Sequence, residues 1–184
     1  MPIDREKLKT LRIPLDSAFY EDCSAADHWF LLARAFQECC LHLFGEMIEK
    51  KLNVSFHHAK VAVSLFEQGV ELFLKAGIAQ AGKEVPTAGH PLDKLYKQFK
   101  NLYDGKQFEF TGSVEAFVKP SEIFPHNQYA RYPTDKAGKP WDARGHSFID
   151  LAKFYEQASL FLEDFNRLWP LMKARYPTAK PAQP

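Results

Sequence analysis

The sequence predicts an all-α protein: an up-down bundle of four to five helices with a long irregular insertion before the last helix. Apolar residues recur at spacings of three and four in several long stretches, which is the period of one face of an α-helix. Ser-x-x-Asp capping motifs stand at the start of two of these stretches, at Ser24 and Ser147. Residues from about 104 to 146 lack a sustained helical period, and an irregular stretch of this length is usually functional or mobile.

The composition is that of a folded globule. A chain of 184 residues suits one domain, and 46% apolar residues are enough to fill a core. The formal net charge is only +1, whereas proteins that coat nucleic acid in bulk are far more basic. Any contact with RNA or DNA must therefore come from a local patch.

We divide the chain into an N-terminal extension at 1–23, a bundle at 24–172 that contains the irregular insertion, and a flexible Pro-rich tail at 173–184, with fraying expected from Pro170 onward. The first residues contain no apolar run of signal-peptide length, and no membrane span is expected. Three Cys do not make a disulfide framework, so we expect buried thiols and a cytoplasmic location.

The first helix is expected to run from the capping box at Ser24 and Asp27 to about Lys51. Its inward face is predicted from the apolar residues at spacings of three and four, which are Trp29, Leu32, Phe36, Cys39, Leu43 and Met47.

The second helix, capped by Ser55 and ended by Gly82, is apolar on most sides and should be central to the bundle. Its small residues Ala62, Gly69 and Ala76 are seven apart, a period that lets a neighbouring helix approach closely. Glu71 and Lys75 are expected to pair on the one solvated strip, an interpretation that we prefer to a polar cleft there.

A short third helix is expected with Pro91 in its first turn and Asp93 complementing its dipole. The last helix begins at Ser147 and carries two apolar rows: Phe148, Leu151, Tyr155, Ala158, Leu162, Phe165 and Trp169, flanked by Phe154, Phe161 and Leu168. So wide an apolar face can cover the bundle on one side and a partner chain on the other. We therefore expect a homodimer formed through this helix.

The order of these elements resembles the HEPN domains, the higher eukaryote and prokaryote nucleotide-binding family. In that family, a helix that ends in a Glu-Leu-Leu-Lys-Ala type motif precedes a loop with His-Asp-Leu. The matching residues in this chain are Glu71, Leu72, Leu74, Lys75 and Ala76, followed by His90, Leu92 and Leu95. The resemblance covers roughly residues 24–172 in element order.

The resemblance implies a helical bundle that dimerises through its later helices and binds RNA or a nucleotide. It also implies a prokaryotic stress, toxin–antitoxin or defence setting and a partner of the nucleotidyltransferase type. Catalytic members carry an Arg and, four to six residues later, a His near the start of the last helix. This chain departs from that pattern, because Arg144 and His146 have only Gly145 between them. Whether the protein is an enzyme is left open, and efficient RNase activity is not expected.

The best candidate site is the basic, aromatic loop before the last helix, with Arg131, Tyr132, Arg144 and His146 as nucleotide- or RNA-binding residues. His90 could contact a phosphate at the start of the third helix. The alternatives are a loop that packs back on the bundle and a His90 that fixes its own loop.

A second class of function remains open: a helical-bundle enzyme or scaffold that acts on a small molecule at the same loop. No cofactor is expected. A metal site is not expected either, because Glu-x-x-His motifs are absent and the adjacent His57 and His58 would point to different helix faces.

Overall fold

The computed structural model describes residues 23–49, 56–85, 92–112 and 151–177. These ranges contain four α-helices and one short 3-10 helix and no strand. The elements are α2 (Ala25–Ile48), α3 (Phe56–Gln80), α4 (Leu92–Leu102), the 3-10 helix η2 (Lys106–Phe108) and α7 (Leu151–Arg175). The predicted all-α helical bundle is confirmed.

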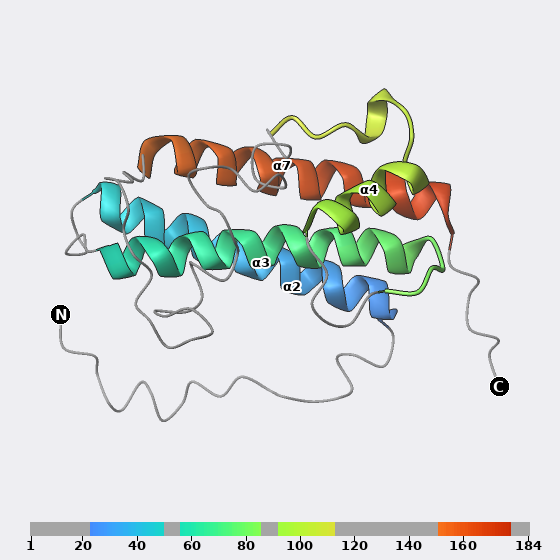
Figure 1. The fold of residues 1–184 in the computed structure, drawn as a ribbon, viewed down its shortest axis with the longest axis horizontal. Coiled ribbons are helices and arrows are strands. Elements are labelled where there is room, and N and C mark those ends of the chain that lie inside the picture. Colours follow the sequence, from blue (N-terminus) through green and yellow to red (C-terminus); the bar gives the residue numbers. More distant parts are fainter. Residues whose placement is uncertain (1–22, 50–55, 86–91, 113–150, 178–184) are drawn as a thin grey trace.

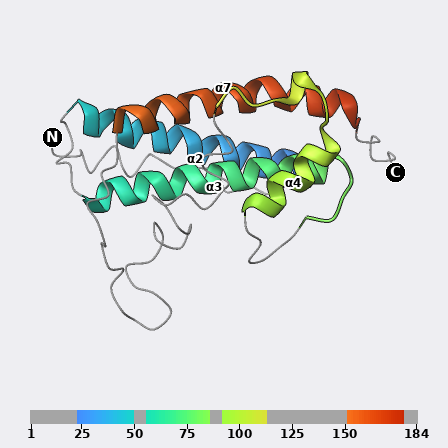
Figure 2. The same cartoon turned by 45° about the horizontal axis from the view of Figure 1, so that its top comes forward.

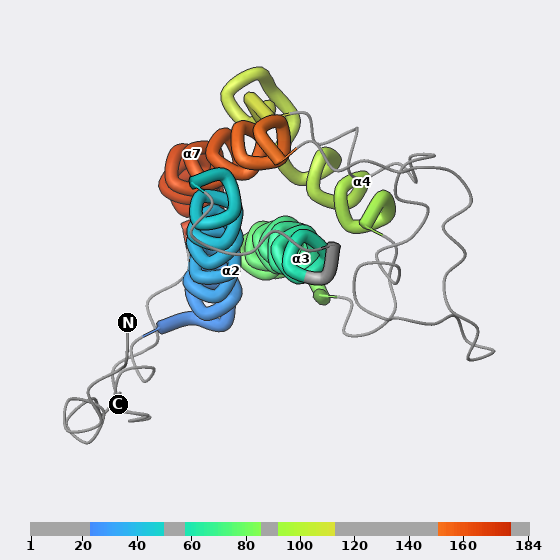
Figure 3. Tube along the Cα trace, turned by 90° about the vertical axis from the view of Figure 1, so that its left-hand side faces the viewer, coloured from blue at the N-terminus to red at the C-terminus, as the bar shows by residue number. Residues whose placement is uncertain are grey.

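Helices α2, α3 and α7 lie side by side along the length of the molecule (Figures 1 and 2). Helix α2 runs antiparallel to the other two, and the short α4 lies against α3 (Figure 3). Helix α3 contacts α2, α4 and α7, which places it at the centre of the bundle as its apolar circumference predicts.

The start of α2 is capped as predicted. The backbone N–H of Asp27 donates to the Ser24 hydroxyl at 3.1 Å, and the backbone N–H of Ser24 donates to the Asp27 carboxylate at 3.2 Å. The predicted caps Ser55 and Ser147 lie outside the described residues. Because an acid in the first turn also complements the helix dipole, Asp27 and Asp93 stabilise the starts of α2 and α4 in the same way.

Met47 of the predicted inward face of α2 is buried as predicted, but the centre of that face was misplaced by a fraction of a turn. Leu32 and Cys39 are exposed, and Trp29, Phe36 and Leu43 are only half-buried. The face that packs between α3 and α7 is made by Ala26, Phe30, Ala33, Gln37, Cys40, Phe44 and Met47. Apolar residues cover so much of this helix that its periodicity alone did not locate the centre of the buried face.

The three thiols do not share one environment. Cys40 is fully buried, and burial raises the pKa of its thiol far above the ordinary value. Cys39 is exposed and Cys23 is half-buried, so the expectation of buried thiols is correct only for Cys40.

Helix α3 follows its prediction closely. Ala62, Gly69 and Ala76 are all buried, and Gly69 lies directly against α2. The helix ends in a Schellman motif: the backbone N–H of Lys83 donates to Ile78 O and that of Gly82 to Ala79 O. Gly82 has a φ of 67°, a left-handed conformation that glycine adopts without strain.

One side chain on the expected solvated strip of α3 is buried. Lys75 Nζ pairs with Glu71 Oε1 at 2.8 Å, as predicted, but Lys75 is only 7% exposed. Its ammonium lies over the half-buried Trp29 ring, 5.4 Å from the ring centroid. The prediction of a solvated pair was wrong because α2 brings an aromatic ring over the strip.

Both apolar rows of α7 face the bundle. Phe154, Phe161 and Leu168 of the flanking row are buried, as are Ala158, Phe165 and Trp169 of the main row, and only Tyr155 of the predicted residues described is exposed. The surplus apolar face on which the expectation of a dimer was based is therefore not present in the described part of α7. The dimer itself stays a prediction.

Helix α7 also continues through Pro170 to Arg175, so the expected fraying at Pro170 was wrong. Proline has no N–H to donate to the carbonyl four residues earlier, which usually ends a helix. Here the following turn is fixed by tertiary contacts. Met172 is fully buried, and the Tyr176 hydroxyl donates to Leu102 O at 3.1 Å.

Candidate functional site

The five predicted site residues, His90, Arg131, Tyr132, Arg144 and His146, all lie outside the described residues. Their roles stay predictions. The structure does describe both ends of the segment that carries four of them, at Gly112 and at Leu151, and it shows how these ends are attached to the bundle.

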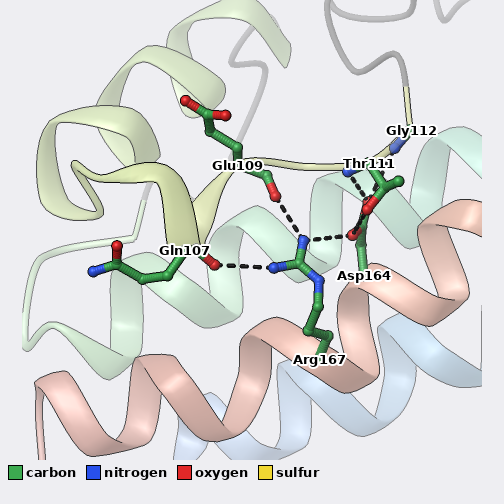
Figure 4. A network of polar contacts seen from close by, with 6 residues as sticks. All are labelled: Gln107, Glu109, Thr111, Gly112, Asp164 and Arg167. Atoms are coloured by element: carbon green, nitrogen blue, oxygen red, sulfur yellow. Dashed lines mark hydrogen bonds and ion pairs between the residues drawn. The ribbon is translucent and has the colours of Figure 1, made fainter.

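The segment before Gly112 is attached to α7 by a buried carboxylate (Figure 4). Asp164 is 1% exposed and accepts four hydrogen bonds. Two come from backbone N–H groups, Thr111 N at 2.6 Å and Gly112 N at 3.1 Å, and one from the Thr111 hydroxyl at 2.8 Å. The fourth comes from the guanidinium of Arg167 at 2.6 Å. A buried charge is tolerated only when it is hydrogen-bonded in this way.

Arg167 extends the attachment to two further positions of the same segment. Its Nη1 donates to Gln107 O at 2.9 Å and its Nη2 to Glu109 O at 2.6 Å (Figure 4). Asp164 and Arg167 therefore hold the backbone of residues 107–112 along α7, and we call this pair the α7 clasp. Gly112 fits here because a Cβ would meet the Phe161 ring at 3.1 Å.

The clasp fixes the position of Gly112, the last described residue before the segment that carries four of the predicted site residues. Leu151 begins the described part of α7 thirteen residues before Asp164, roughly 20 Å along the helix axis at 1.5 Å per residue. The two described ends of that segment therefore lie beside the middle of α7 and at the start of its described part.

A cleft of about 580 Å³ opens between α4 and residues 107–112, which we call the clasped segment because the α7 clasp holds them. Five of its ten described lining residues are aromatic: Tyr96, Phe99, Tyr103, Phe108 and Phe110. The other five are Lys100, Asp104, Gly105, Glu109 and Gly112. Phe99, Tyr103 and Phe108 are buried in the core beneath it, whereas Tyr96 and Phe110 are half-buried and keep accessible surface. Tyr96 and Phe110 meet edge to face, with centroids 6.3 Å apart and an interplanar angle of 60°.

The rim of the cleft is charged. Lys100 and Glu109 are exposed, and neither has an ion-pair partner among the described residues; Lys100 Nζ instead lies 5.6 Å from the centroid of the Tyr96 ring. Asp104 is already paired with Arg175 of α7. Among the described residues of the rim, the two charges without an ion-pair partner are therefore the ammonium of Lys100 and the carboxylate of Glu109.

The end of α7 packs against α3 and against the residues that follow α4, next to the cleft. Tyr103 donates its buried hydroxyl to Gly77 O at 2.8 Å, and burial raises the pKa of this hydroxyl well above its ordinary range. The Gln80 amide donates to Tyr176 O, and Arg175 lies over the Phe108 ring at 5.4 Å. These contacts fix α3, α4 and α7 to one another beside the cleft.

In the described ranges, no group of three or more His, Cys, Asp or Glu side chains is arranged to hold a metal ion. None of the helices described is both long enough and apolar enough to cross a membrane.

The family model of the HEPN domain matches residues 46–168 of this chain. The chain belongs to the HEPN domain family. The match includes α3, α4 and most of α7, and it spans all five predicted site residues. No curated protein and no solved structure matches the chain.

Sequence reasoning missed the α7 clasp. One signal was available: Asp164 lies on the apolar side of its helix, between Phe161 and Phe165, where an ionised group must find partners. Nothing in the sequence pattern indicates that those partners are the backbone of residues more than fifty positions earlier.

Proposed function

We propose that this HEPN-domain protein binds RNA or a nucleotide through the segment between Gly112 and α7. The observation that carries the proposal is the family match, which extends over the whole segment and both of its attachments. Arg131, Arg144 and His146 would contact phosphate, and Tyr132 would stack on a base, the combination found in single-strand binding proteins. His90 would contribute a further contact at the start of α4.

We further propose that RNase activity is weak or absent. Cleavage needs an imidazole and a guanidinium converging on one phosphate: one acts on a proton and the other stabilises developing charge. Arg144 and His146, separated only by Gly145, lack the spacing that family members with RNase activity use. Phosphate binding is less demanding, since it requires only that positive charge be near.

The proposed setting is a prokaryotic stress, toxin–antitoxin or defence system in the cytoplasm, with a nucleotidyltransferase-type protein as partner. The protein would act as a homodimer. Sedimentation at micromolar concentration should give twice the chain mass of 21.1 kDa, and a single species at the chain mass would contradict the dimer.

Binding is tested by fluorescence anisotropy with a labelled single-stranded RNA of mixed sequence, and by calorimetry with nucleotides. Arg144→Ala should weaken RNA binding roughly tenfold or more, because a hydrogen bond to a charged group contributes about 1.5–3 kcal/mol. Lys153→Ala, which removes an exposed positive charge from α7, is the matched control and should change binding little. Absence of any binding by the wild-type chain would overturn the proposal.

Cleavage is tested on the same RNA by gel electrophoresis. The RNA should remain intact with wild-type protein under conditions in which it is bound. Robust cleavage that disappears in His146→Ala would show that Arg144 and His146 act as a catalytic pair despite their spacing, and the non-catalytic part of the proposal would then be wrong.

A further inference from the structure

We propose that the cleft between α4 and the clasped segment is a second ligand site, separate from the segment between Gly112 and α7, and that it takes a guanine nucleotide. The inference relies on the proposed function only for the choice of nucleotides as the ligand family. The features of the site that carry the inference belong to described residues of α4 and of the stretch 105–112.

The size and walls of the cleft fit a planar ring. A volume of about 580 Å³ lies within the range of about 300–1,000 Å³ that small-molecule sites occupy. Phe110 is held by rings on several sides: its centroid lies 5.9 Å from Phe73, 5.7 Å from Phe99 and 5.7 Å from Phe161. Phe110 is half-buried in this cluster and lines the cleft, so a ring whose position is fixed by its neighbours is accessible to an aromatic ligand.

The carboxylate of Glu109 favours a ligand whose aromatic ring carries hydrogen-bond donors on one edge. A carboxylate accepts hydrogen bonds at two oxygens and donates none when ionised. Guanine presents two adjacent donors, N1–H and the N2 amino group, whereas adenine presents an unprotonated N1 at the same place. Glu109 is exposed, lines the cleft, and has no ion-pair partner among the described residues; its backbone carbonyl is fixed by Arg167.

The ammonium of Lys100 favours an anionic group on the same ligand. The ammonium lies 5.6 Å from the centroid of the Tyr96 ring, and it does not pair with an acid in the described part of the chain. A compact cation such as an amine would satisfy Glu109 and the rings but would be repelled by Lys100. A nucleotide that combines a donor edge with a phosphate satisfies both charges.

The first test compares nucleotides on the full-length chain. Calorimetric titrations with GMP and AMP should give GMP binding at least tenfold tighter, and inorganic phosphate alone should not bind measurably. In an amide-detected NMR titration, GMP should shift the signals of Lys100, Gly105, Glu109 and Phe110. Equal affinity for the two nucleotides, or shifts confined to other residues, would overturn the assignment.

The decisive variant is Glu109→Gln, which keeps the size of the side chain and removes the charge. It should lower GMP affinity at least tenfold and leave AMP affinity unchanged, so that the preference between the two is lost. Glu163→Gln, an exposed carboxylate on α7 away from the cleft, is the control and should keep the preference. Because the readout is a ratio within one protein, loss of folded protein does not imitate it.

Lys100→Gln tests the phosphate contact. It should weaken GMP and leave guanosine unchanged, and an equal loss for both would overturn this part of the assignment. A primary amine that competes with GMP at equal concentration would show that the cleft is a cation site and would overturn the choice of ligand.

Two further experiments distinguish a free nucleotide from the end of an RNA strand as the ligand, and they test this inference separately from the proposed function. A short single-stranded RNA that ends in guanosine should compete with GMP for the cleft if the base can enter as part of a strand. Arg144→Ala should weaken RNA binding without changing the GMP shifts at Lys100 and Glu109. Wild-type protein that binds GMP in the cleft but no RNA would contradict only the proposed function, and wild-type protein that binds RNA but shows no GMP shifts at Lys100 and Glu109 would contradict only this inference.

Discussion

Gly69 of α3 faces Gln37 of α2 so closely that a Cβ atom at Gly69 would lie 2.9 Å from Gln37 Oε1 and 3.2 Å from the backbone oxygen of Ala33. Gln37 is fully buried, and neither atom of its side-chain amide has a hydrogen-bond partner within the described residues. Within the described residues, this contact between the two helices therefore combines a glycine that admits the neighbour with a buried amide that has no hydrogen-bond partner.

Replacing Gly69 by Leu should overpack this contact and lower the free energy of unfolding by about 1–3 kcal/mol or more. The measurement is chemical denaturation followed by circular dichroism. Val61→Leu adds bulk at a position of the same helix that is 53% exposed and should be nearly neutral. Unchanged stability of Gly69→Leu would contradict the close approach of α2 and α3.

A double-mutant cycle identifies the contact. Gly69→Ala introduces only the Cβ, which improves helix propensity by about 1 kcal/mol but collides with Gln37 and Ala33. In a Gln37→Ala background the nearest collision is removed. Gly69→Ala should therefore be more favourable there than in the wild type, with a coupling of at least about 0.5 kcal/mol. Additive effects would show that Gln37 does not restrict Gly69.

Replacing Gln37 by Met should stabilise the protein. The unbranched Met side chain has nearly the same shape and removes two buried polar atoms that lack partners, and each such atom costs about 1–3 kcal/mol. We expect the free energy of unfolding to rise by at least about 1 kcal/mol. The same exchange at the exposed Gln107 is the control and should be close to neutral. A loss of stability in Gln37→Met would show that the amide does find a partner, such as an ordered water.

The α7 clasp can be opened by Asp164→Asn. The amide presents a donor where a carboxylate oxygen now accepts, and it removes the charge that pairs with Arg167. Unfolding free energy should fall by about 2–3 kcal/mol, since a hydrogen bond to a charged group contributes about 1.5–3 kcal/mol. Hydrogen exchange at the Thr111 and Gly112 amides should accelerate more than exchange in the middle of α2. Glu163→Gln, one position earlier on α7, should change neither quantity.

The pairing of Asp27 predicts a pH dependence. Burial alone would raise the pKa of this carboxylate, but hydrogen bonds from Ser24 and Lys173 outweigh burial, so its pKa in the folded protein is lower than in the unfolded chain. The resulting stabilisation is complete above the unfolded pKa of about 3.9 and is lost as pH falls through the folded value. Asp27→Asn should therefore be less stable than wild type at pH 6, and the difference should shrink below about pH 4.

The size of this difference is at most about 1 kcal/mol, because the Asp27–Lys173 pair is partly exposed. Denaturation midpoints of the two proteins should be compared at several pH values between 2.5 and 7, a range chosen to bracket the carboxylate pKa of about 3.9. Glu84→Gln, at an exposed carboxylate after α3, should follow the wild type at every pH. A difference that is the same at pH 6 and below pH 3 would contradict the role of the carboxylate charge.

The sequence by itself determined the described helices, the cap at Ser24 and the end of α3 at Gly82. The spacing of apolar residues, the capping box at Ser24 and the glycine at 82 act through contacts within a few residues, so they are legible without knowledge of the fold. The central position of α3 was also predictable from the sequence, because only a central helix can bury apolar residues on most of its sides. The five residues predicted to bind a ligand lie outside the described ranges and remain predictions.

Tertiary structure decided which face of each helix is buried and which distant groups meet. Trp29 and Phe30 are both apolar, and only the positions of α3 and α7 made Phe30 the core residue, stacked on Trp169 at 4.5 Å. The burial of Lys75 under Trp29 and the attachment of Thr111 to Asp164 depend on residues that are far apart in the chain. Such pairings leave no periodic signal, because they are set by how the helices pack and not by the order of residues within any one of them.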